Sequence, residues 1–542
     1  YKRGWRDAAV DTTVTRAGEN AVDVTFTITE RAPTRLARIV VDDPTGTLRP
    51  RDRRRLLGLA PGDPLDLLRL DSAVVRLRDA YWERGYGDVQ VRRPAIAVDT
   101  AADTAQVAIA VARGPLTPIA SIDILRLSGE ATVSDETIRH SLSIKPGDLF
   151  RRSEIARSQR ALYESGLFRS ALIDTAVATG AATGRTVCAQ QSSLPETVRA
   201  PATGDSSKAL VVCVVEGPLR EASVSTGFTT ADFVQIGGRY SHLHWLGGAR
   251  RLDVQATVGN LGSRQLYRAL PAGLNNAFLN DRIVGGTEPR YFLPTYTAGA
   301  EVRQRWFGSP RNTLATGLFV HRRSSPGVFV DRGQGANLSF TRELTATTPA
   351  SATYRFEFNR VEASEVYFCV NFGVCDLGTV SALGRAQRLS PLALSTSTAR
   401  VDNPLAPRRG FIGRAELQHA SGFTLSDFRY NRISAELSVY RPAPFLRGAT
   451  LAARVRGGYV VSLGGTVRAL GIEGARGLDG AAPRDVLHPR TRFYAGGSQS
   501  VRGFGENQLG PRVLVIPPST LTGAPENLCN GALRLCDLNA LR

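Results

Sequence analysis

The stretch ATYRFEFNRVE at residues 352–362 alternates between apolar and polar side chains. Successive side chains of an extended strand point to opposite faces, so the two kinds separate: Tyr354, Phe356 and Phe358 against Arg355, Glu357 and Asn359. An aromatic outer face and a charged inner face suit the wall of a transmembrane barrel with a polar interior. A soluble β-sandwich would keep its charges outside instead, and alternation alone does not distinguish the two folds.

Similar stretches follow one another from residue 221 onward, separated by Gly, Asn, Asp and Pro. They number about eleven before residue 465 and include 249–260, 312–322, 431–442 and 450–461. The first, EASVSTGFT at 221–229, is rich in Ser, Thr and Gly. The sequence therefore predicts an antiparallel sheet domain over residues 221–542.

The chain before residue 221 is repetitive instead. YKRGW at 1–5, YWERGYGDV at 81–89 and LYESGLFRSA at 162–171 share an aromatic residue followed by a glycine. These glycines, Gly4, Gly85 and Gly166, recur at one constant interval along the chain. Each repeat ends in an alternating strand before a proline: VDVTFTITERAP, QVAIAVARGP and ALVVCVVEGP. A fixed period of this kind indicates repeated small domains.

Between these landmarks the apolar residues have helical spacing. Residues 64–84 place leucines, Val74 and Tyr81 on one face, and residues 153–166 do the same after Ser153, a favourable N-cap residue. The glycine after each aromatic residue suits a helix end, because glycine adopts positive φ readily. With opening strands at 35–43 and 119–129, each repeat is predicted to run strand, helix, helix, strand, strand.

Composition narrows the class of protein. The chain has 542 residues and a formal net charge of +19, and its only lysines are Lys2, Lys145 and Lys208. The arginine excess could mark a nucleic-acid or anionic membrane partner, or a GC-rich genome. No RNA-binding, helix-turn-helix or zinc-finger pattern occurs, so we expect no nucleic-acid partner. No apolar run approaches the ~18 residues of a membrane-spanning helix. The absence of Met leads us to expect that the N-terminal part is missing.

The six cysteines fall into three local pairs: Cys188 with Cys213, Cys369 with Cys375, and Cys529 with Cys536. An even number in neighbouring positions favours disulfides made in an oxidising compartment, with free thiols as the alternative. No CxxC motif occurs, and no histidine lies close enough to suggest zinc. The first pair would close a Ser/Thr/Gly/Pro-rich excursion at roughly 176–207, and the others would staple exposed loops.

Three further motifs carry a family resemblance: FYAGGSQSVRGFGENQLGP at 493–511, DNPLAPRRGF at 402–411 and EPRYFLP at 288–294. In this order, behind the repeats, they resemble the BamA/TamA superfamily of outer-membrane protein assembly factors. The repeats resemble its POTRA modules. The resemblance implies α+β POTRA repeats followed by an antiparallel transmembrane β-barrel. It implies modules at 1–33 (the C-terminal part only), 34–118 and 119–220, and an incomplete barrel at 221–542.

The same resemblance implies function, partners and location. The expected function is assembly and insertion of β-barrel proteins into the bacterial outer membrane, through strand addition to a POTRA edge and templating at a lateral barrel seam. The expected partners are unfolded outer-membrane β-barrel proteins and lipid, with periplasmic chaperones and assembly lipoproteins possible. The modules would lie in the periplasm. The alternative is a two-partner secretion translocator that exports one passenger; a passive porin or adhesin would explain the barrel but not the VRGF motif.

Val501, Arg502, Gly503 and Phe504 form the VRGF part of the first motif. An arginine can anchor a long loop inside a polar barrel through a charge-assisted bond to a wall carboxylate. Gly503 would let the backbone pass tightly, and Phe504 would fill an apolar niche. We expect Arg502 to be this anchor. In the family the acidic partner lies on later strands; the family has sixteen, so both the closing strands and that carboxylate are expected beyond residue 542.

No pattern indicates an enzyme, a cofactor or a metal site. The glycines around Phe504 do not complete G-x-G-x-x-G, and GGSQS at 496–500 is not the G-x-S-x-G nucleophile motif. His242 and His244 lie two apart on one strand face, but no third ligand is near, so a surface pair is the preferred interpretation.

Overall fold

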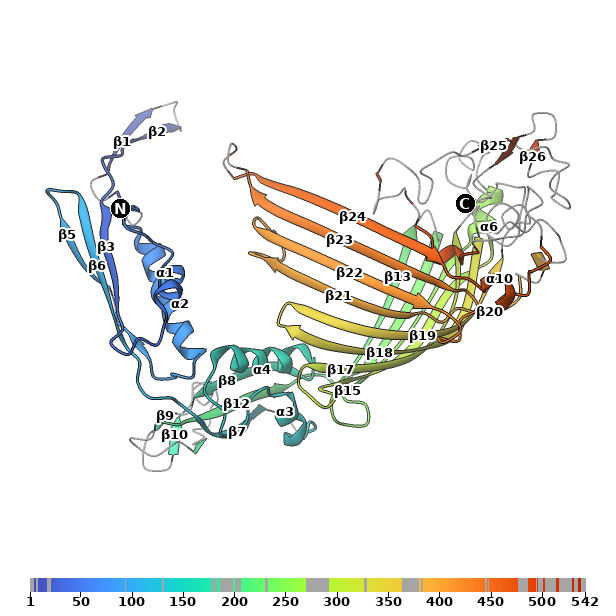
Figure 1. Ribbon diagram of the computed structural model, residues 1–542, viewed down its shortest axis with the longest axis horizontal. Helices are drawn as coiled ribbons and strands as arrows, with labels where there is room; N and C mark the ends of the chain where they lie inside the picture. Colours follow the sequence, from blue (N-terminus) through green and yellow to red (C-terminus); the bar gives the residue numbers. More distant parts are fainter. Residues whose placement is uncertain are drawn as a thin grey trace. The chain divides into compact units, whose positions relative to one another are not determined.

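The computed structural model describes the chain with gaps. The described residues are 4–5, 8–16, 21–92, 94–128, 131–175, 177–178, 183–185, 198–199, 206–229, 233–269, 292–325, 329–362, 380–381, 384–443, 446, 448–475, 486–493, 495, 501–502, 513–515, 529–530 and 535–537. The chain divides into two compact units, Tyr1–Gly217 and Pro218–Arg542 (Figure 1). Within the described residues, no helix is both long enough and apolar enough to cross a membrane.

The first complete module of the N-terminal unit has the predicted order of elements. Its sheet contains β3 (Arg35–Asp42), β4 (Gln90–Val91), β5 (Ala95–Asp99) and β6 (Thr104–Ala112), and its helices are α1 (Pro50–Leu57) and α2 (Leu67–Trp82). Strand β6 is central: it pairs parallel with β3 and antiparallel with both β4 and β5. The expected three-stranded sheet therefore has one edge strand, the second in chain order, divided into the two short pieces β4 and β5. Pro94, which lacks a backbone N–H, stands at the division.

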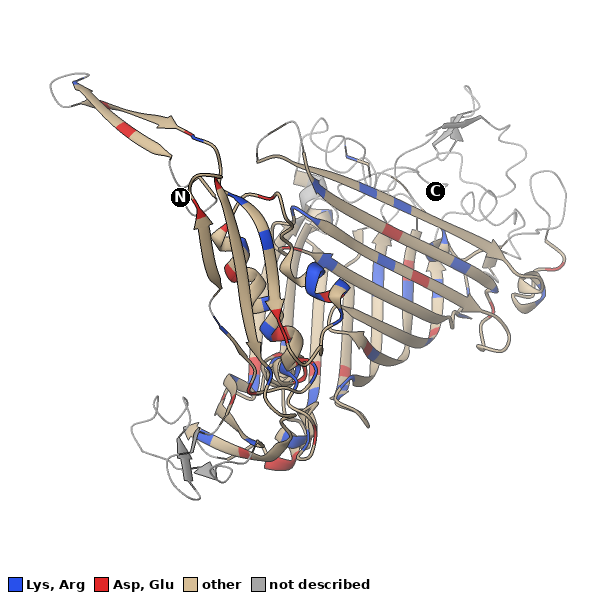
Figure 2. Cartoon of the chain, turned by 60° about the vertical axis from the view of Figure 1, so that its left-hand side comes forward, with Lys and Arg blue, Asp and Glu red and all other residues tan. Residues whose placement is uncertain are grey.

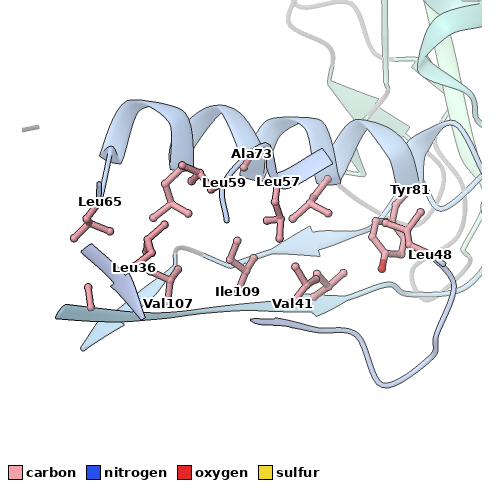
Figure 3. Packing of buried hydrophobic residues seen from close by; sticks show 14 of the residues in the cluster. Leu36, Val41, Leu48, Leu57, Leu59, Leu65, Ala73, Tyr81, Val107 and Ile109 are labelled. Carbon is pink, nitrogen blue, oxygen red and sulfur yellow. The ribbon is translucent and has the colours of Figure 1, made fainter. Parts of the chain in front are cut away.

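The helices of this module cover one face of its sheet (Figure 3). Leucines of both helices pack on alternate residues of the central strand, among them Val107 and Ile109, which are fully buried. Gly85 follows α2 with a φ of +92°, so the predicted glycine helix end is observed. At the far end of the core, Tyr81 Oη donates a 2.6 Å hydrogen bond to Asp43 Oδ2.

The second module repeats this topology with β7 (Ile119–Ser128), α3 (Asp135–Ser141), α4 (Arg152–Glu164), β8 (Phe168–Thr175) and β12 (Lys208–Glu216). Strand β12 is again central, parallel to β7 and antiparallel to β8. The prediction that Ser153 is the N-cap of α4 is wrong, because Arg151 occupies that position. Ser153 lies in the first turn, where its N–H donates 2.8 Å to Glu83 Oε1, so a residue of the preceding module satisfies this helix end.

Several shorter elements complete the N-terminal unit. The hairpin of β1 (Ala9–Arg16) and β2 (Val22–Thr29) precedes the modules and pairs with no other described strand. Between β8 and β12, three short strands form a small sheet: β9 (Val177–Ala178), β10 (Thr183–Arg185) and β11 (Val198–Arg199).

The second unit is one antiparallel sheet that curves strongly (Figure 1). Its strands are β13 (Arg220–Thr229), β14 (Phe233–His242), β15 (Arg250–Leu261), β16 (Thr295–Arg305), β17 (Asn312–Ser325), β18 (Phe329–Thr345), β19 (Thr348–Glu362), β21 (Leu392–Val401), β22 (Gly410–Ala420), β23 (Tyr430–Pro442) and β24 (Thr450–Ser462), with the short β20 (Gln387–Arg388) beside β19. The estimate of about eleven strands agrees with this order. Among the described strands, β13 pairs only with β14, and β24 only with β23.

The two faces of the sheet differ as alternation predicts. Apolar residues of the outer face are exposed, among them Leu318, Leu437 and Val455. Charged residues of both signs occur at intervals along the strands (Figure 2), and pairs such as Arg454–Glu436, at 2.8 Å, lie on the inner face. Exposed apolar residues on one face and ion pairs on the other are the arrangement of a barrel wall between lipid and a polar interior.

The connections at the two ends of the sheet also differ. At the end where β13 begins, the turns are short, such as residues 346–347 between β18 and β19. The opposite end carries the longer connections, including α6 (Ser263–Ala269), α10 (Thr466–Ala469), and a 3₁₀ turn η2 (Pro489–Thr491). Three short strands, β25 (Val513–Val515), β26 (Cys529–Asn530) and β27 (Leu535–Asp537), pair with one another. Short turns at one end and long loops at the other are typical of outer-membrane barrels.

Candidate functional site

A cluster of buried polar side chains lies on the inner face of β17, β18 and β19. Asp331 of β18 and Glu357 of β19 are 2% and 0% exposed, although each carries a carboxylate. His321 of β17 lies between them, with Nε2 3.2 Å from Asp331 Oδ2. Burying a carboxylate costs free energy unless a cation or hydrogen-bond donors compensate its charge. The groups that contact Asp331 and Glu357 therefore identify the partners of this part of the wall.

Glycine at the inner positions of β18 makes room for the cluster. A Cβ at Gly333 would overlap the Glu357 carboxylate and would lie 2.7 Å from His321 Cε1. Two residues further, a Cβ at Gly335 would lie 3.0 Å from the Phe319 ring. Because β18 presents no side chain at these two positions, residues from β17 and β19 can meet above it.

The cluster binds Arg490, which belongs to the long connection after β24. Arg490 Nη1 lies 3.2 Å from Asp331 Oδ2, and Nη2 lies 2.9 Å from Glu357 Oε2. Arg355 supplies the second cation, with Nε 2.7 Å from Glu357 Oε2 and its guanidinium 4.0 Å above the Phe319 ring. Two carboxylates thus face two guanidinium groups, and one of these comes from the loop rather than from the wall.

His488, two residues before Arg490, makes a second polar contact with the wall. Its Nδ1 accepts from the backbone N–H of Arg490 at 3.2 Å, so its Nε2 carries the proton and donates to Asn359 Oδ1 at 2.7 Å. Burial lowers the pKa of His488, which lies outside the strands, to about 3. The ring is therefore neutral at physiological pH, and the tautomer is determined by its two partners.

Apolar residues surround the polar cluster and exclude water from it. Phe428 packs edge-to-face on His488 with ring centroids 5.0 Å apart. A hydrophobic cluster continues around them through residues of the strand ends and the neighbouring loops: Phe329, Val361, Leu389, Ala420, Tyr430, Leu470, Ile472, Ala475 and Val486. Low polarity around an ion pair strengthens its attraction and raises the cost of breaking it.

The same loop segment continues along the inner face. The ring of Phe493 lies directly against Gly458 of β24, where any Cβ would overlap it. Arg432 of β23 covers the ring, with its guanidinium 4.5 Å from the centroid. Residues 488–493 therefore contact the inner face at β18 and β19 through His488 and Arg490, and at β23 and β24 through Phe493.

The VRGF residues are placed only in part. Val501 and Arg502 form part of a turn and are exposed, and Arg502 forms no ion pair with any residue that the structure describes. Gly503 and Phe504 lie outside the described residues. Anchoring by Arg502 therefore stays a prediction. Sequence reasoning missed Arg490 and its partners; the available signal was DRGQG at 331–335, an acid followed by glycines at alternate positions of a strand.

The cysteines are also placed in part. Cys213 is buried in β12 and is disulfide-bonded. Its predicted partner Cys188, like Cys369 and Cys375, lies outside the described residues. Cys529 and Cys536 are register partners on β26 and β27. The three pairings stay predictions.

The other two family-like motifs have local structural explanations. In DNPLAPRRGF, Asp402 Oδ1 accepts from the backbone N–H groups of Arg408 and Arg409 at 2.9 and 3.0 Å. These hydrogen bonds lower the pKa of the exposed Asp402 carboxyl, and the bond from Arg409 has the largest effect. Gly410 follows with a φ of +112°, and a Cβ there would overlap the Arg400 carbonyl oxygen. In EPRYFLP, the Leu293 and Pro294 carbonyls accept from Arg322 Nη1.

Residues 496–500 and 503–508, which were rejected as catalytic or nucleotide-binding motifs, lie outside the described residues. The expectation that His242 and His244 share a strand face is wrong, because β14 ends at His242 and His244 lies in the turn that follows. The backbone N–H of His244 donates to His242 Nδ1 at 3.3 Å, which leaves that nitrogen no free lone pair for a metal. No group of three or more metal-ligating side chains occurs in the part of the chain that the structure describes.

An antiparallel sheet with lipid-type and lumen-type faces, preceded by α+β modules, defines a class: outer-membrane β-barrel proteins with periplasmic modules. Comparison with known proteins gives the family. The Omp85 superfamily domain matches residues 245–531, and the POTRA repeat, described as "Surface antigen variable number repeat", matches 35–114 and 120–187. The chain belongs to the Omp85 superfamily. It lies in the outer membrane, with its POTRA modules in the periplasm.

Similar solved structures include BamA from Haemophilus ducreyi lacking POTRA domains 1–3, at 12% identity and a TM-score of 0.49, covering 90% of this chain and 78% of that one. CdiB from Escherichia coli is 14% identical with a TM-score of 0.41, covering 91% and 75%. No curated protein sequence matches the chain.

Proposed function

We propose that this protein assembles and inserts β-barrel proteins into the outer membrane. The observation that supports this most directly is the edge of β13. Among the described strands it pairs on one side only, with β14, while Val224 and Phe228 on its outer face are 84% and 64% exposed. An edge in lipid has backbone groups that only another strand can satisfy, so it favours pairing with an incoming β-strand.

The modules supply a second kind of edge. Among the described strands, β5 pairs only with β6 and β8 only with β12, so each offers one side to an extended polypeptide. Strand addition there would hold an unfolded substrate through main-chain hydrogen bonds, which tolerate many sequences. Unfolded barrel proteins are accordingly the proposed partners, delivered by periplasmic chaperones and aided by assembly lipoproteins. The domain division at 1–33, 34–118, 119–220 and 221–542, the Arg502 anchor and the three disulfides belong to this proposal.

Site-specific photocrosslinking in the full-length protein tests the seam. A crosslinker at Val224 should capture a folding barrel substrate. The same group at Leu437 should not, because β23 is paired on both sides and Leu437 has a similar outward position. Equal capture at both positions, or none at Val224, would contradict the seam mechanism.

A two-partner secretion translocator is the competing function. It would pass its substrate through the polar interior rather than the wall. A crosslinker at Arg239, on the inner face of β14, would then capture the passenger while Val224 would not. Capture at the inner position alone would favour secretion over assembly.

A further inference from the structure

The contact between the inner wall and the loop after β24 is made by Arg490, a loop cation that reaches two buried carboxylates. We propose that Arg490 is a positioning residue that seats the loop after β24 on the inner wall, with Asp331 and Glu357 as its seat. The inference goes beyond the proposed function and holds equally for an assembly factor and for a secretion translocator.

Charge balance makes the seat specific for an arginine. Asp331 and Glu357 come from neighbouring strands, and Arg355 of the wall neutralises only one of them. Asn359 Nδ2 donates to both, at 2.5 Å and 3.0 Å, but brings no charge. His321 lies 3.2 Å from Asp331 and 3.6 Å from Glu357 and adds a positive charge only when it is protonated. With a neutral His321 and without Arg490, the wall would keep one uncompensated buried carboxylate, a state that is strongly disfavoured.

The geometry of the loop backbone supports positioning rather than chance contact. Pro489 stands between His488 and Arg490 in the 3₁₀ turn, and Thr491 Oγ1 donates 2.7 Å to the His488 carbonyl. The His488 ring is held by Asn359, the same residue that binds both carboxylates. The turn is thus held by hydrogen bonds of its own that do not involve the guanidinium, and such local order reduces the entropy lost when Arg490 binds the wall.

The seat is independent of the VRGF arginine. Arg502 lies about a dozen residues further along the chain, and a stretch of that length can extend roughly 40 Å. Seating at Arg490 therefore fixes the beginning of the loop and leaves the VRGF residues free to occupy, or to leave, a separate partner. The structure thus shows an attachment point at Arg490, in addition to the one that the sequence motif predicts at Arg502.

The test uses a benzophenone amino acid in place of Phe493 in the full-length protein. Because the Phe493 ring lies against Gly458, ultraviolet light should join residue 493 to β24, and peptide mass spectrometry measures the yield. Arg490→Ala should lower this yield at least about tenfold, since a buried ion pair is lost. Arg490→Lys should fall between, because a lysine provides one charge but no bidentate geometry.

Two controls separate positioning from damage to the fold. Arg454→Ala removes the same charge from the inner wall without touching the loop, because Arg454 pairs with Glu436, and it should leave the yield unchanged. Arg490→Ala combined with Glu357→Gln restores charge balance in the cluster but not the seat. This double variant should recover barrel stability in a heat-modifiability gel while the yield stays low. An unchanged crosslinking yield in Arg490→Ala or in the double variant would overturn the proposal.

Discussion

Replacing Tyr81 by Phe should destabilise the N-terminal unit by a predictable amount. The Tyr81 side chain is fully buried, and its hydroxyl joins α2 to Asp43 at the end of β3. The substitution keeps the ring and its packing but leaves Asp43 Oδ2 without this donor, while Thr45 still donates to Oδ1. Losing a hydrogen bond to a buried charged group costs about 1.5–3 kcal/mol.

The loss should depend on pH with a definite sign. Burial tends to raise the pKa of Asp43, but hydrogen bonds from Thr45 and Tyr81 outweigh it and hold the pKa below the ordinary value of 3.8. Ionised Asp43 therefore stabilises the fold above about pH 4, and this contribution disappears as the pH falls through the lower folded value. The difference in unfolding free energy between wild type and Tyr81→Phe should be full at pH 7 and smaller at a pH below the folded pKa of Asp43.

Urea unfolding of residues 1–217, followed by circular dichroism at pH 7 and at about pH 2, measures both quantities. Tyr163→Phe is the matched control, because Tyr163 lies on α4 and is 48% exposed. A loss below about 0.5 kcal/mol at pH 7, or one equal at both pH values, would refute the assigned role of the hydroxyl.

Other substitutions test the barrel and the module joint. Gly333→Ala should destabilise the barrel by about 1–3 kcal/mol because its methyl group overpacks the carboxylate cluster. The barrel should then unfold at a lower temperature on a heat-modifiability gel. Gly457→Ala should leave that temperature unchanged, because nothing lies within 4 Å of a Cβ at that position. Gly410→Ala should reduce the yield of folded barrel, because its φ of +112° is unfavourable for any other residue, whereas Gly413→Ala should be neutral. Glu83→Ala should lower the urea midpoint of residues 1–217 by the equivalent of about 1 kcal/mol, since it exposes the first turn of α4; no shift would show that water replaces the carboxylate.

The fold could be predicted because the environment of each strand residue determines whether its side chain is apolar or polar. In a barrel strand each side chain faces either lipid or the polar interior, so a stretch such as 352–362 already shows both faces. The repeat glycines were equally informative: Gly85 and Gly166 have positive φ after α2 and α4. The division of the module strand at Pro94 and the capping of α4 by Glu83 were not predicted, since both depend on tertiary neighbours.

The loop seat could not be predicted from local sequence. Arg490 is one of many arginines, and its partners Asp331 and Glu357 lie far earlier in the chain, on strands whose neighbours were not known. The prediction chose Arg502 because its motif resembles a family signature. A buried ion pair between distant segments leaves no periodicity, and only the glycines beside Asp331 distinguish this stretch from the other strands.

The central position of the last strand in each module has a consequence for folding order. In the described part of each module, β3 and β5 are joined through β6, and β7 and β8 are joined through β12. While the last strand of a module is still crossing the inner membrane, the edge strands already exported cannot pair with each other. The two helices then have no complete sheet to pack on. The module can close only when its final segment emerges, and closure then forms both strand ladders at once. Each module would accordingly fold as one cooperative step, timed by the arrival of residues 104–112 or 208–216 rather than by the first strand to appear.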